Sequence, residues 1–517
     1  MYGCILHVDF AVCPQWKTPG TGAFYMRESG ILMHITSLPG PYGVGSMGKA
    51  AFRFVDFLQA AGQKYWQILP LTPTGYGDSP YQSNSAYAGN PYLIDLEQLV
   101  EEGLLKPEEL QDIPWCSRED KVDFGAQYNH RMTVLRIAYS RFRQHDQLEV
   151  FCHENSNWLP DFCLYMALKG KFNGEPWYRW ERSLKFRAPN ALWKIRHELS
   201  DELRFYSFVQ FIFYHQWAKL RAYARQAGVK IIGDVPIYVP YDSVDVWVNS
   251  ELFQLDENMD PTDVAGVPPD GFTADGQLWG NPLYRWDVME KQDFVWWKNR
   301  MAAAGKLYDV IRLDHFRGFE AYWAVPYGET TAKNGRWEKG PGMDFISALQ
   351  EALPQLDLIA EDLGFLTQSV FDLRDGANLP GMRVLEFAFD SREPSTYLPY
   401  NYPVNSVCYT GTHDNMTMRQ WFETAPADAV AYATEYMALS EQEGLVWGVI
   451  RTAMSSTSRL CIVQMQDYLN LGGEARMNFP GTMTDANWTW RVSADRITEE
   501  LATKIRRMTV LYGRAVR

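Results

Sequence analysis

Four ionisable side chains stand within six residues of each other at the end of a short apolar run. The run is DVI at 309–311, and the side chains that follow it are Arg312, Asp314, His315 and Arg317. Burial of charged groups is costly, so such groups are either paired or used in chemistry. Two interpretations of this stretch are open: a buried Arg–Asp pair that anchors a strand end, or a strand that delivers its acid to an open site.

The pattern of an apolar run that ends in an acid recurs along the chain. Asp234, Glu361 and Asp414 each follow or close such a run. Two carboxyl groups about 5–5.5 Å apart are typical of a retaining glycosidase, in which one attacks the anomeric carbon and the other protonates the leaving oxygen. Arg312 lies two residues before Asp314 and hence on the same strand face, where it would keep that carboxyl ionised. The acids therefore predict cleavage of a glycosidic bond.

A metal site is the alternative for the same region. Barrel metallohydrolases bind their ion through two close histidines or through a clear set of His and carboxylate ligands. His34, His315 and His413 each stand alone on a strand. We therefore expect no metal and no cofactor, and His413, beside Asp414, is instead suited to binding sugar hydroxyls. The role of Asp362, next to Glu361, stays open: it points away from the site, or it raises the pKa of its neighbour.

Eight short apolar strands that alternate with helices are needed to position these acids. The strands are predicted at 31–35, 65–71, 229–237, around Asp314, and at 357–364, 381–389, 406–415 and 460–467. Helical patterns lie at about 47–61, 201–226, 345–352, 427–437 and 494–512. This alternation predicts an α/β protein with a (β/α)8 TIM barrel, in which chemistry collects at the C-terminal ends of the strands. The repeat is regular from the fourth strand on, and too little chain follows the eighth for a C-terminal sandwich domain.

Two long insertions are expected after strands two and three. Residues 74–228 are too long for a connecting loop and read as a helical subdomain, and residues 240–308 form a second insertion. Residues 1–27 lack the features of a secretory signal, so we expect a dispensable extension ahead of a catalytic barrel at 28–517.

Composition excludes several classes of partner. The 517 residues carry a formal net charge of -14, which argues against nucleic acid and against an anionic membrane surface. No apolar run approaches the roughly 18 residues that a membrane-spanning helix needs. The seven cysteines are odd in number and form no C-x-x-C pair, which is typical of a reducing, cytoplasmic location.

Several ordered motifs together resemble the 4-α-glucanotransferases (amylomaltases or disproportionating enzymes) of glycoside hydrolase family 77, in the α-amylase clan. The motifs are TSLPGPYG at 36–43, SPYQS at 79–83, WGNP at 279–282, RLDHFR at 312–317, AEDLG at 360–364, GTHDN at 411–415 and EARMN at 474–478. The resemblance covers residues 28–517. Leu313 departs from the Ile that the family often has, and residues 1–27 have no counterpart.

The resemblance implies a role for each matching position. Asp314 would be the nucleophile, Glu361 the acid/base, and Asp414 the acid that stabilises the distorted transition state. The implied substrate-binding residues are Arg312, His413, Tyr81, Asp234, Trp279, Asn281 and, in the loop GVPPDGF at 266–272, Pro268 and Phe272. The loop would cover the acceptor side and keep water out. Purely structural roles stay open for some of them. Trp279 and Tyr81 could be packing aromatics, Asp234 could cap a strand end, and the loop could be an ordinary surface loop.

The implied activity is transfer of a 1,4-α-glucan segment to the 4-hydroxyl of an acceptor glucose or glucan, through a covalent glycosyl–aspartate intermediate. Maltooligosaccharides and starch- or glycogen-derived glucans would be the substrates. Two rival functions remain, a retaining α-glucan hydrolase of the same clan and a silent barrel that only binds glucan. The intact set of three acids argues against the silent barrel. The sequence does not decide oligomeric state or preferred chain length.

Overall fold

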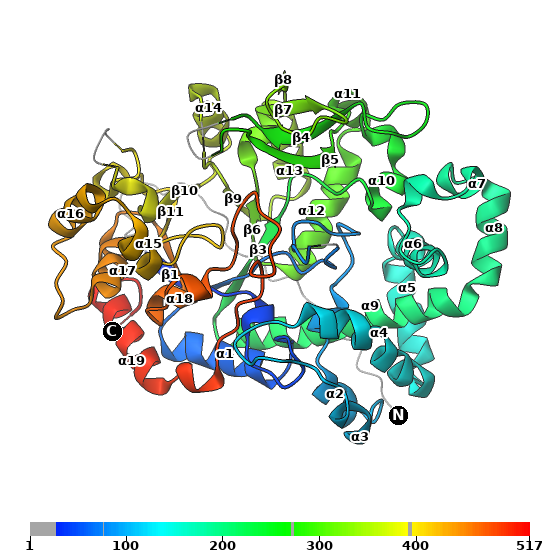
Figure 1. Ribbon diagram of the computed structural model, residues 1–517, viewed down its shortest axis with the longest axis horizontal. Coiled ribbons are helices and arrows are strands. Elements are labelled where there is room, and N and C mark those ends of the chain that lie inside the picture. The colour runs from blue at the N-terminus through cyan, green and yellow to red at the C-terminus, as the bar shows by residue number, and fades with distance from the viewer. Residues whose placement is uncertain (1–26, 76, 270–272, 365, 391–394, 517) are drawn as a thin grey trace.

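A closed barrel of eight parallel strands forms the centre of the molecule (Figure 1). The computed structural model describes residues 27–75, 77–269, 273–364, 366–390 and 395–516. The barrel order is β1-β12-β11-β10-β9-β6-β3-β2. The strands are β1 (Glu28–Leu32), β2 (Tyr65–Gln67), β3 (Lys230–Val235), β6 (Val310–Leu313), β9 (Asp357–Ala360), β10 (Gly381–Val384), β11 (Ser406–Tyr409) and β12 (Leu460–Gln464). The predicted (β/α)8 barrel is confirmed.

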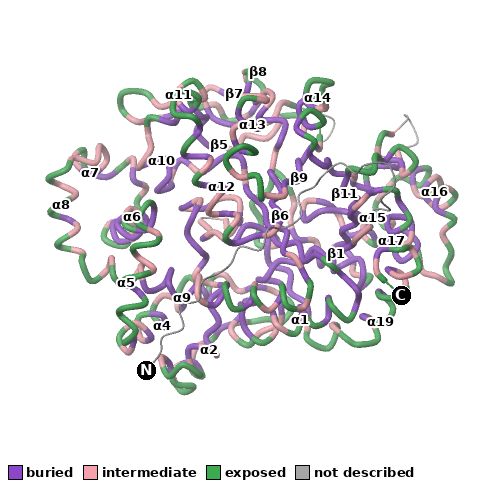
Figure 2. Tube along the Cα trace, turned by 180° about the vertical axis from the view of Figure 1, so that it is seen from behind, coloured by how far each residue is buried: buried purple, intermediate pink, exposed green. Residues whose placement is uncertain are grey.

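Helices cover the outside of the barrel and bury one face against it. In α1 (Lys49–Ala60) the buried residues include Phe54, Val55 and Leu58, spaced as one side of a helix requires. The helix ends before Gly62, whose positive φ of 71° lets the chain turn back towards β2. The other covering helices are α9 (Ser200–Gln226), α12 (Val295–Leu307), α13 (Gly342–Ala352), α14 (Gln368–Gly376), α15 (Met418–Thr424), α16 (Ala427–Tyr436), α17 (Leu445–Ser455), α18 (Met465–Tyr468) and α19 (Glu499–Leu511). Figure 2 shows buried residues gathered in the barrel and exposed residues along its periphery.

A group of helices lies between β2 and β3, to one side of the barrel in Figure 1. They are α2 (Leu96–Glu101), α3 (Glu108–Gln111), α4 (Phe124–Arg141), α5 (His145–Glu154), α6 (Leu159–Lys171), α7 (Arg182–Lys185) and α8 (Pro189–Glu198). Helices α4, α5 and α6 and the residues next to them pack on α9 through aromatic side chains, and the rings of Phe142 and Phe208 lie 5.0 Å apart. This is the helical content expected after strand two. None of the helices described is long and apolar enough to cross a membrane.

A second sheet of four antiparallel strands is formed by two strands that precede β6 in the chain and two that follow it. Its order is β5-β4-β7-β8, with β4 (Asp263–Val267), β5 (Gln277–Pro282), β7 (Ala321–Pro326) and β8 (Arg336–Lys339). The expectation of a regular repeat after the fourth barrel strand is therefore wrong. β7 pairs with β4 and covers an edge that would otherwise stay open, and its Ala324 and Val325 are fully buried. Two further helices, α10 (Val244–Val248) and α11 (Trp286–Lys291), flank β4 and β5 along the chain.

Candidate active site

The strand ends bring the predicted acids to one end of the barrel. Asp234 lies within β3, Asp314 directly follows β6, and Glu361 directly follows β9. Asp414 stands five residues beyond the end of β11. Because the strands are parallel, all these acids lie at their C-terminal ends, as the fold requires of a catalytic set.

Arg312 ties two of the acids together at the centre of this site. It is 3% exposed, and its guanidinium donates to Asp234 Oδ2 at 2.7 Å and to Asp314 Oδ1 at 2.9 Å. Both interpretations of this stretch therefore hold at once: a buried Arg–Asp pair exists, and the same arginine also holds the acid beyond the strand. The ion pair with Arg312 favours the charged form of Asp314.

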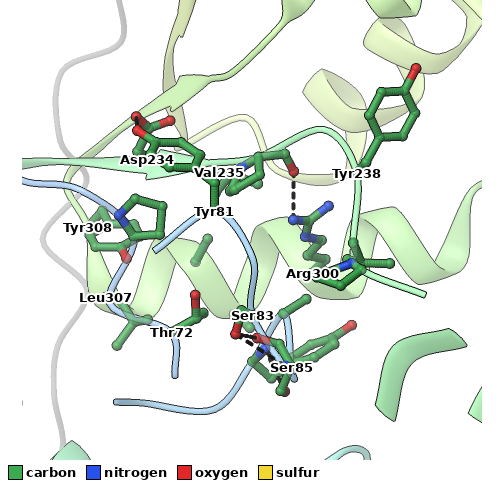
Figure 3. A pocket seen from close by; sticks show the side chains of 18 residues that line it. Thr72, Tyr81, Ser83, Ser85, Asp234, Val235, Tyr238, Arg300, Leu307 and Tyr308 are labelled. Atoms are coloured by element: carbon green, nitrogen blue, oxygen red, sulfur yellow. Dashed lines mark hydrogen bonds between the residues drawn. The ribbon is translucent and has the colours of Figure 1, made fainter. Parts of the chain in front are cut away.

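Tyr81 closes the site beside Asp234. Its hydroxyl donates to Asp234 Oδ2 at 2.8 Å, and its ring stacks on His413 with centroids 5.2 Å apart and planes 13° apart. Figure 3 shows Tyr81 and Asp234 together at one side of a cavity of about 40 Å³. That volume holds a few water molecules, since one water needs about 10–15 Å³ by the same measure. The cavity is therefore too small to be a sugar subsite by itself.

Glu361 is held by two backbone donors in a buried position. The N–H of His315 donates to its Oε2 at 2.7 Å, and the N–H of Leu363 donates to its Oε1 at 3.0 Å. Burial raises the pKa of Glu361 well above its ordinary value, and the nearby Asp314 raises it further. Burial also raises the pKa of Asp314, but Arg312 opposes this through its direct hydrogen bond. Burial thus raises the pKa values of both carboxyls, that of Asp314 to about 7, and only Asp314 accepts a direct hydrogen bond from Arg312.

His315 is strained where it connects these two acids. Its φ of 50° lies in the left-handed region, which non-glycine residues adopt at a cost. The conformation directs its N–H at Glu361, while its ring lies 4.8 Å from that of Trp279 in an edge-on arrangement. Trp279 therefore contacts His315, which in turn contacts Glu361.

Residues in the segment that follows β12 hold Asp414 in place. Asn478 donates to its Oδ1 at 2.6 Å, and Arg476 donates to its backbone carbonyl at 2.8 Å. His413 Nε2 lies 3.3 Å from Asp414 Oδ2, and burial lowers the pKa of His413, so the ring is neutral. The Asp414 side chain is 42% exposed, which leaves it open to a ligand.

The remaining predicted residues are placed less centrally. Asn281 lies on β5 two residues after Trp279 and is 4% exposed. Pro268 directly follows β4 and is partly buried, whereas Phe272 lies outside the described residues. Asp362 points away from the site, because it is fully buried in an ion pair with Arg374.

Three supporting residues were not given roles from the sequence. Arg476 and Asn478 belong to the EARMN motif, and this motif was the available signal for them. His34 follows β1, and the N–H of Leu69 donates to its Nδ1 at 3.2 Å, so its Nε2 carries the proton. Burial lowers the pKa of His34 to about 3. Within the described ranges, no three His, Cys, Asp or Glu side chains gather in a group that could hold a metal ion.

Comparisons with known proteins match nearly all of the barrel. The family model described as 4-alpha-glucanotransferase, of glycoside hydrolase family 77, matches residues 33–497. A 4-alpha-glucanotransferase of Clostridium butyricum is 48% identical over 93% of this chain and 100% of the relative. Another, of Aquifex aeolicus, is 47% identical over 95% of this chain and 100% of the relative.

A solved structure agrees with the sequence comparisons. The amylomaltase of Streptococcus agalactiae in complex with acarbose superposes with a TM-score of 0.92 and is 41% identical, with 95% of this chain and 100% of that chain covered. Acids lie at the strand ends, Arg312 hydrogen-bonds to two of them, and the family match covers nearly all of the barrel. The chain belongs to the 4-alpha-glucanotransferase family, glycoside hydrolase family 77.

Proposed function

We propose that Asp314 is the nucleophile, Glu361 the acid/base and Asp414 the stabilising acid of this 4-alpha-glucanotransferase. The reaction moves a segment of a 1,4-α-glucan from one chain to another. The observation that supports the assignment is that the carboxyls of Asp314 and Glu361, both in the site, interact differently with Arg312. Asp314 accepts a charge-assisted hydrogen bond from Arg312, which favours an ionised nucleophile, whereas Arg312 acts on Glu361 through its charge alone and burial has the larger effect there, which favours a protonated acid.

The first half of the reaction breaks the donor glucan. The ionised Oδ of Asp314 attacks the anomeric carbon, while Glu361 gives its proton to the leaving glycosidic oxygen. The bond that forms is a glycosyl ester of Asp314, and the released chain carries the proton as a new 4-hydroxyl. Asp414, fixed by Asn478, binds ring hydroxyls as positive charge develops at the anomeric carbon.

The second half reverses these roles. The 4-hydroxyl of an acceptor gives its proton to Glu361 and attacks the anomeric carbon from the side that the first chain left. The ester bond to Asp314 breaks, and both carboxyls return to their starting states. Because each step inverts the anomeric carbon, the product keeps the α configuration.

Substrate binding is assigned to the polar and aromatic groups around the acids. Asp234 Oδ1 is buried and has no hydrogen-bond partner among the described residues, so a sugar hydroxyl can satisfy it. Trp279 and Tyr81 offer ring faces to the apolar sides of glucose units. Arg312, His413, Asn281 and the loop residues Pro268 and Phe272 complete the proposed set. Maltooligosaccharides and starch- or glycogen-derived glucans are the proposed substrates, in line with the acarbose in the solved relative.

We also infer a cytoplasmic location and the division into an extension at 1–27 and a barrel at 28–517 with insertions at 74–228 and 240–308. Free thiols at Cys116, Cys152, Cys163, Cys408 and Cys461 support the location. The contacts of α4, α5 and α6 with α9, all within 74–228, support the first insertion as one unit.

Maltotriose is expected to give glucose and a ladder of longer maltodextrins, with little net gain in reducing ends. Transfer conserves reducing ends, because each bond broken is replaced by another. The measurement is total reducing ends against free glucose over time. If reducing ends rise in step with bond cleavage, the enzyme is a hydrolase and the transfer assignment fails.

The pH dependence of kcat/KM is expected to be bell-shaped, and Arg312→Met should move its acidic limb to higher pH. The active form has Asp314 ionised and Glu361 protonated, so activity is lost when pH falls through the first pKa and when it rises through the second. Without Arg312, the pKa of Asp314 rises, so ionisation requires a higher pH. The profile of each protein on a maltodextrin tests this, and an unmoved acidic limb in a folded variant would remove Asp314 as its source.

A further inference from the structure

Glu386 is a buried carboxyl that no step above uses. It follows β10, is 9% exposed, and its backbone N–H donates to the carbonyl of Thr410 at 3.2 Å. Thr410 directly follows β11, at the start of the connection that carries His413 and Asp414. Glu386 therefore lies beside the segment that presents the proposed stabilising acid.

The carboxyl group packs against that segment. A Cβ atom added at Gly411 would lie 3.3 Å from Glu386 Oε2, so no room separates them. The backbone N–H of Met416 and the side-chain amide of Asn415 face the carboxyl and favour its ionised form. Asn415 Oδ1 in turn accepts from the backbone N–H of Thr412 at 2.9 Å and from its hydroxyl at 2.8 Å. Glu386 thus contacts both ends of the turn that contains the acid.

Two charged groups act on Glu386 from other elements. Asp467, in α18, is fully buried and accepts the hydroxyl of Thr410 at 2.6 Å. Arg476 interacts with Glu386 and also donates to the carbonyl of Asp414 at 2.8 Å. The same guanidinium therefore faces Glu386 and supports Asp414.

The surroundings favour the uncharged form of Glu386 at neutral pH. Its Oε2 is buried and has no hydrogen-bond partner among the described residues, which makes a charge there costly. Burial first, and the Asp467 carboxyl second, raise the pKa of Glu386 to about 8. Ionisation would place a second negative charge near Asp467 and attract Arg476 away from Asp414.

We propose that Glu386 is a positioning residue for the transfer reaction, whose neutral carboxyl supports the turn that carries His413 and Asp414 and whose ionisation disturbs that turn. The proposal rests on the role given to Asp414 above. It predicts a loss of activity at alkaline pH that does not come from the acid/base.

The test removes the titration of the acid/base first. In a Glu361→Gln background, fluoride release from α-maltosyl fluoride needs no proton donor, so its kcat/KM reports the first half-reaction alone. We expect this background to lose activity as pH rises through about 8, and the Glu361→Gln/Glu386→Gln double variant to stay level to about pH 9.5. Persistence of the same alkaline limb in the double variant, or its absence from the background, overturns the proposal.

Further variants separate positioning from simple packing. In an otherwise wild-type chain, Glu386→Ala should lower kcat/KM about 100-fold at neutral pH, as a small displacement of a catalytic group does, and Glu386→Gln should recover most of the loss. Equal losses in both variants contradict support by the neutral carboxyl. Asp357→Asn is the matched control: burial raises the pKa of Asp357 to about 6, but it begins β9 at the opposite end of the barrel. The Asp357→Asn variant should keep the same loss of activity at alkaline pH. If this variant abolishes that loss, the loss is not due to Glu386.

The same assay distinguishes this failure from a failure of the underlying assignment. Asp414→Ala should abolish most turnover if Asp414 stabilises the transition state. If that variant keeps wild-type kcat/KM, the role of Asp414 is wrong, whatever the Glu386 variants show. Thermal unfolding of each variant confirms that the compared proteins are folded.

Discussion

Asp314→Ala is expected to give a folded protein whose transfer activity is lower by several orders of magnitude, because no covalent intermediate forms. The fold should tolerate the change, since Asp314 lies beyond the end of β6 and Arg312 keeps its 2.7 Å hydrogen bond to Asp234. The measurement is single-turnover transfer with a maltodextrin, together with thermal unfolding.

A matched control is available at the other end of the same strand. Asp309 directly precedes β6, at the end of the strand opposite the proposed chemistry, and pairs with Arg221 at 2.9 Å. Asp309→Asn should lower the melting temperature and leave kcat nearly unchanged. The nucleophile assignment is wrong if purified Asp314→Ala keeps even about a tenth of wild-type turnover, since loss of a nucleophile costs far more.

Glu361→Gln is expected to slow both half-reactions on natural glucans and to trap the glycosyl-enzyme with an activated donor. A glycosyl fluoride forms the ester with Asp314 without a proton, but the acceptor then lacks a general base, so the ester accumulates. The amide has the size of the carboxyl, and its one oxygen can still accept from one of the two N–H groups, of His315 or Leu363, so the fold should be retained at some cost in stability.

Intact-protein mass spectrometry measures this adduct directly. The expected mass is that of the variant plus one glycosyl unit of the donor. The double variant Asp314→Ala/Glu361→Gln is the control and should carry no adduct. If the fluoride produces no adduct on Glu361→Gln, another group is the acid/base.

The barrel could be predicted from the sequence because each of its strands is an apolar run of its own. The end of a run, though, does not show where pairing stops. Residues 68–71 continue the apolar run of β2 and are buried, yet β2 ends at Gln67. Burial and strand pairing are separate properties, and hydrophobicity reports only the first.

The second sheet could not be predicted, because the partner of β7 lies far away in the chain. The run AYWAVP at 321–326 has the composition of a strand, but nothing local shows that it pairs with β4 across the intervening β6. Among the site residues, Asp314, Glu361 and Asp414 follow from their position at strand ends. The role proposed for Glu386 does not follow from its position, although Glu386 also comes after an apolar run. Only the contacts in the folded protein show that its carboxyl is buried near Asp467.

The pairing of β4 with β7 also sets an order of events during synthesis on the ribosome. β4 and β5 emerge first and pair with each other, but β4 keeps an open edge until β7 has been made. Between them the ribosome must complete β6, which carries Arg312 and leads to Asp314. An unpaired strand edge invites association with other chains, so the nascent protein is most exposed to aggregation in this interval. Completion of the sheet therefore requires that the strand before Asp314 has already been synthesised.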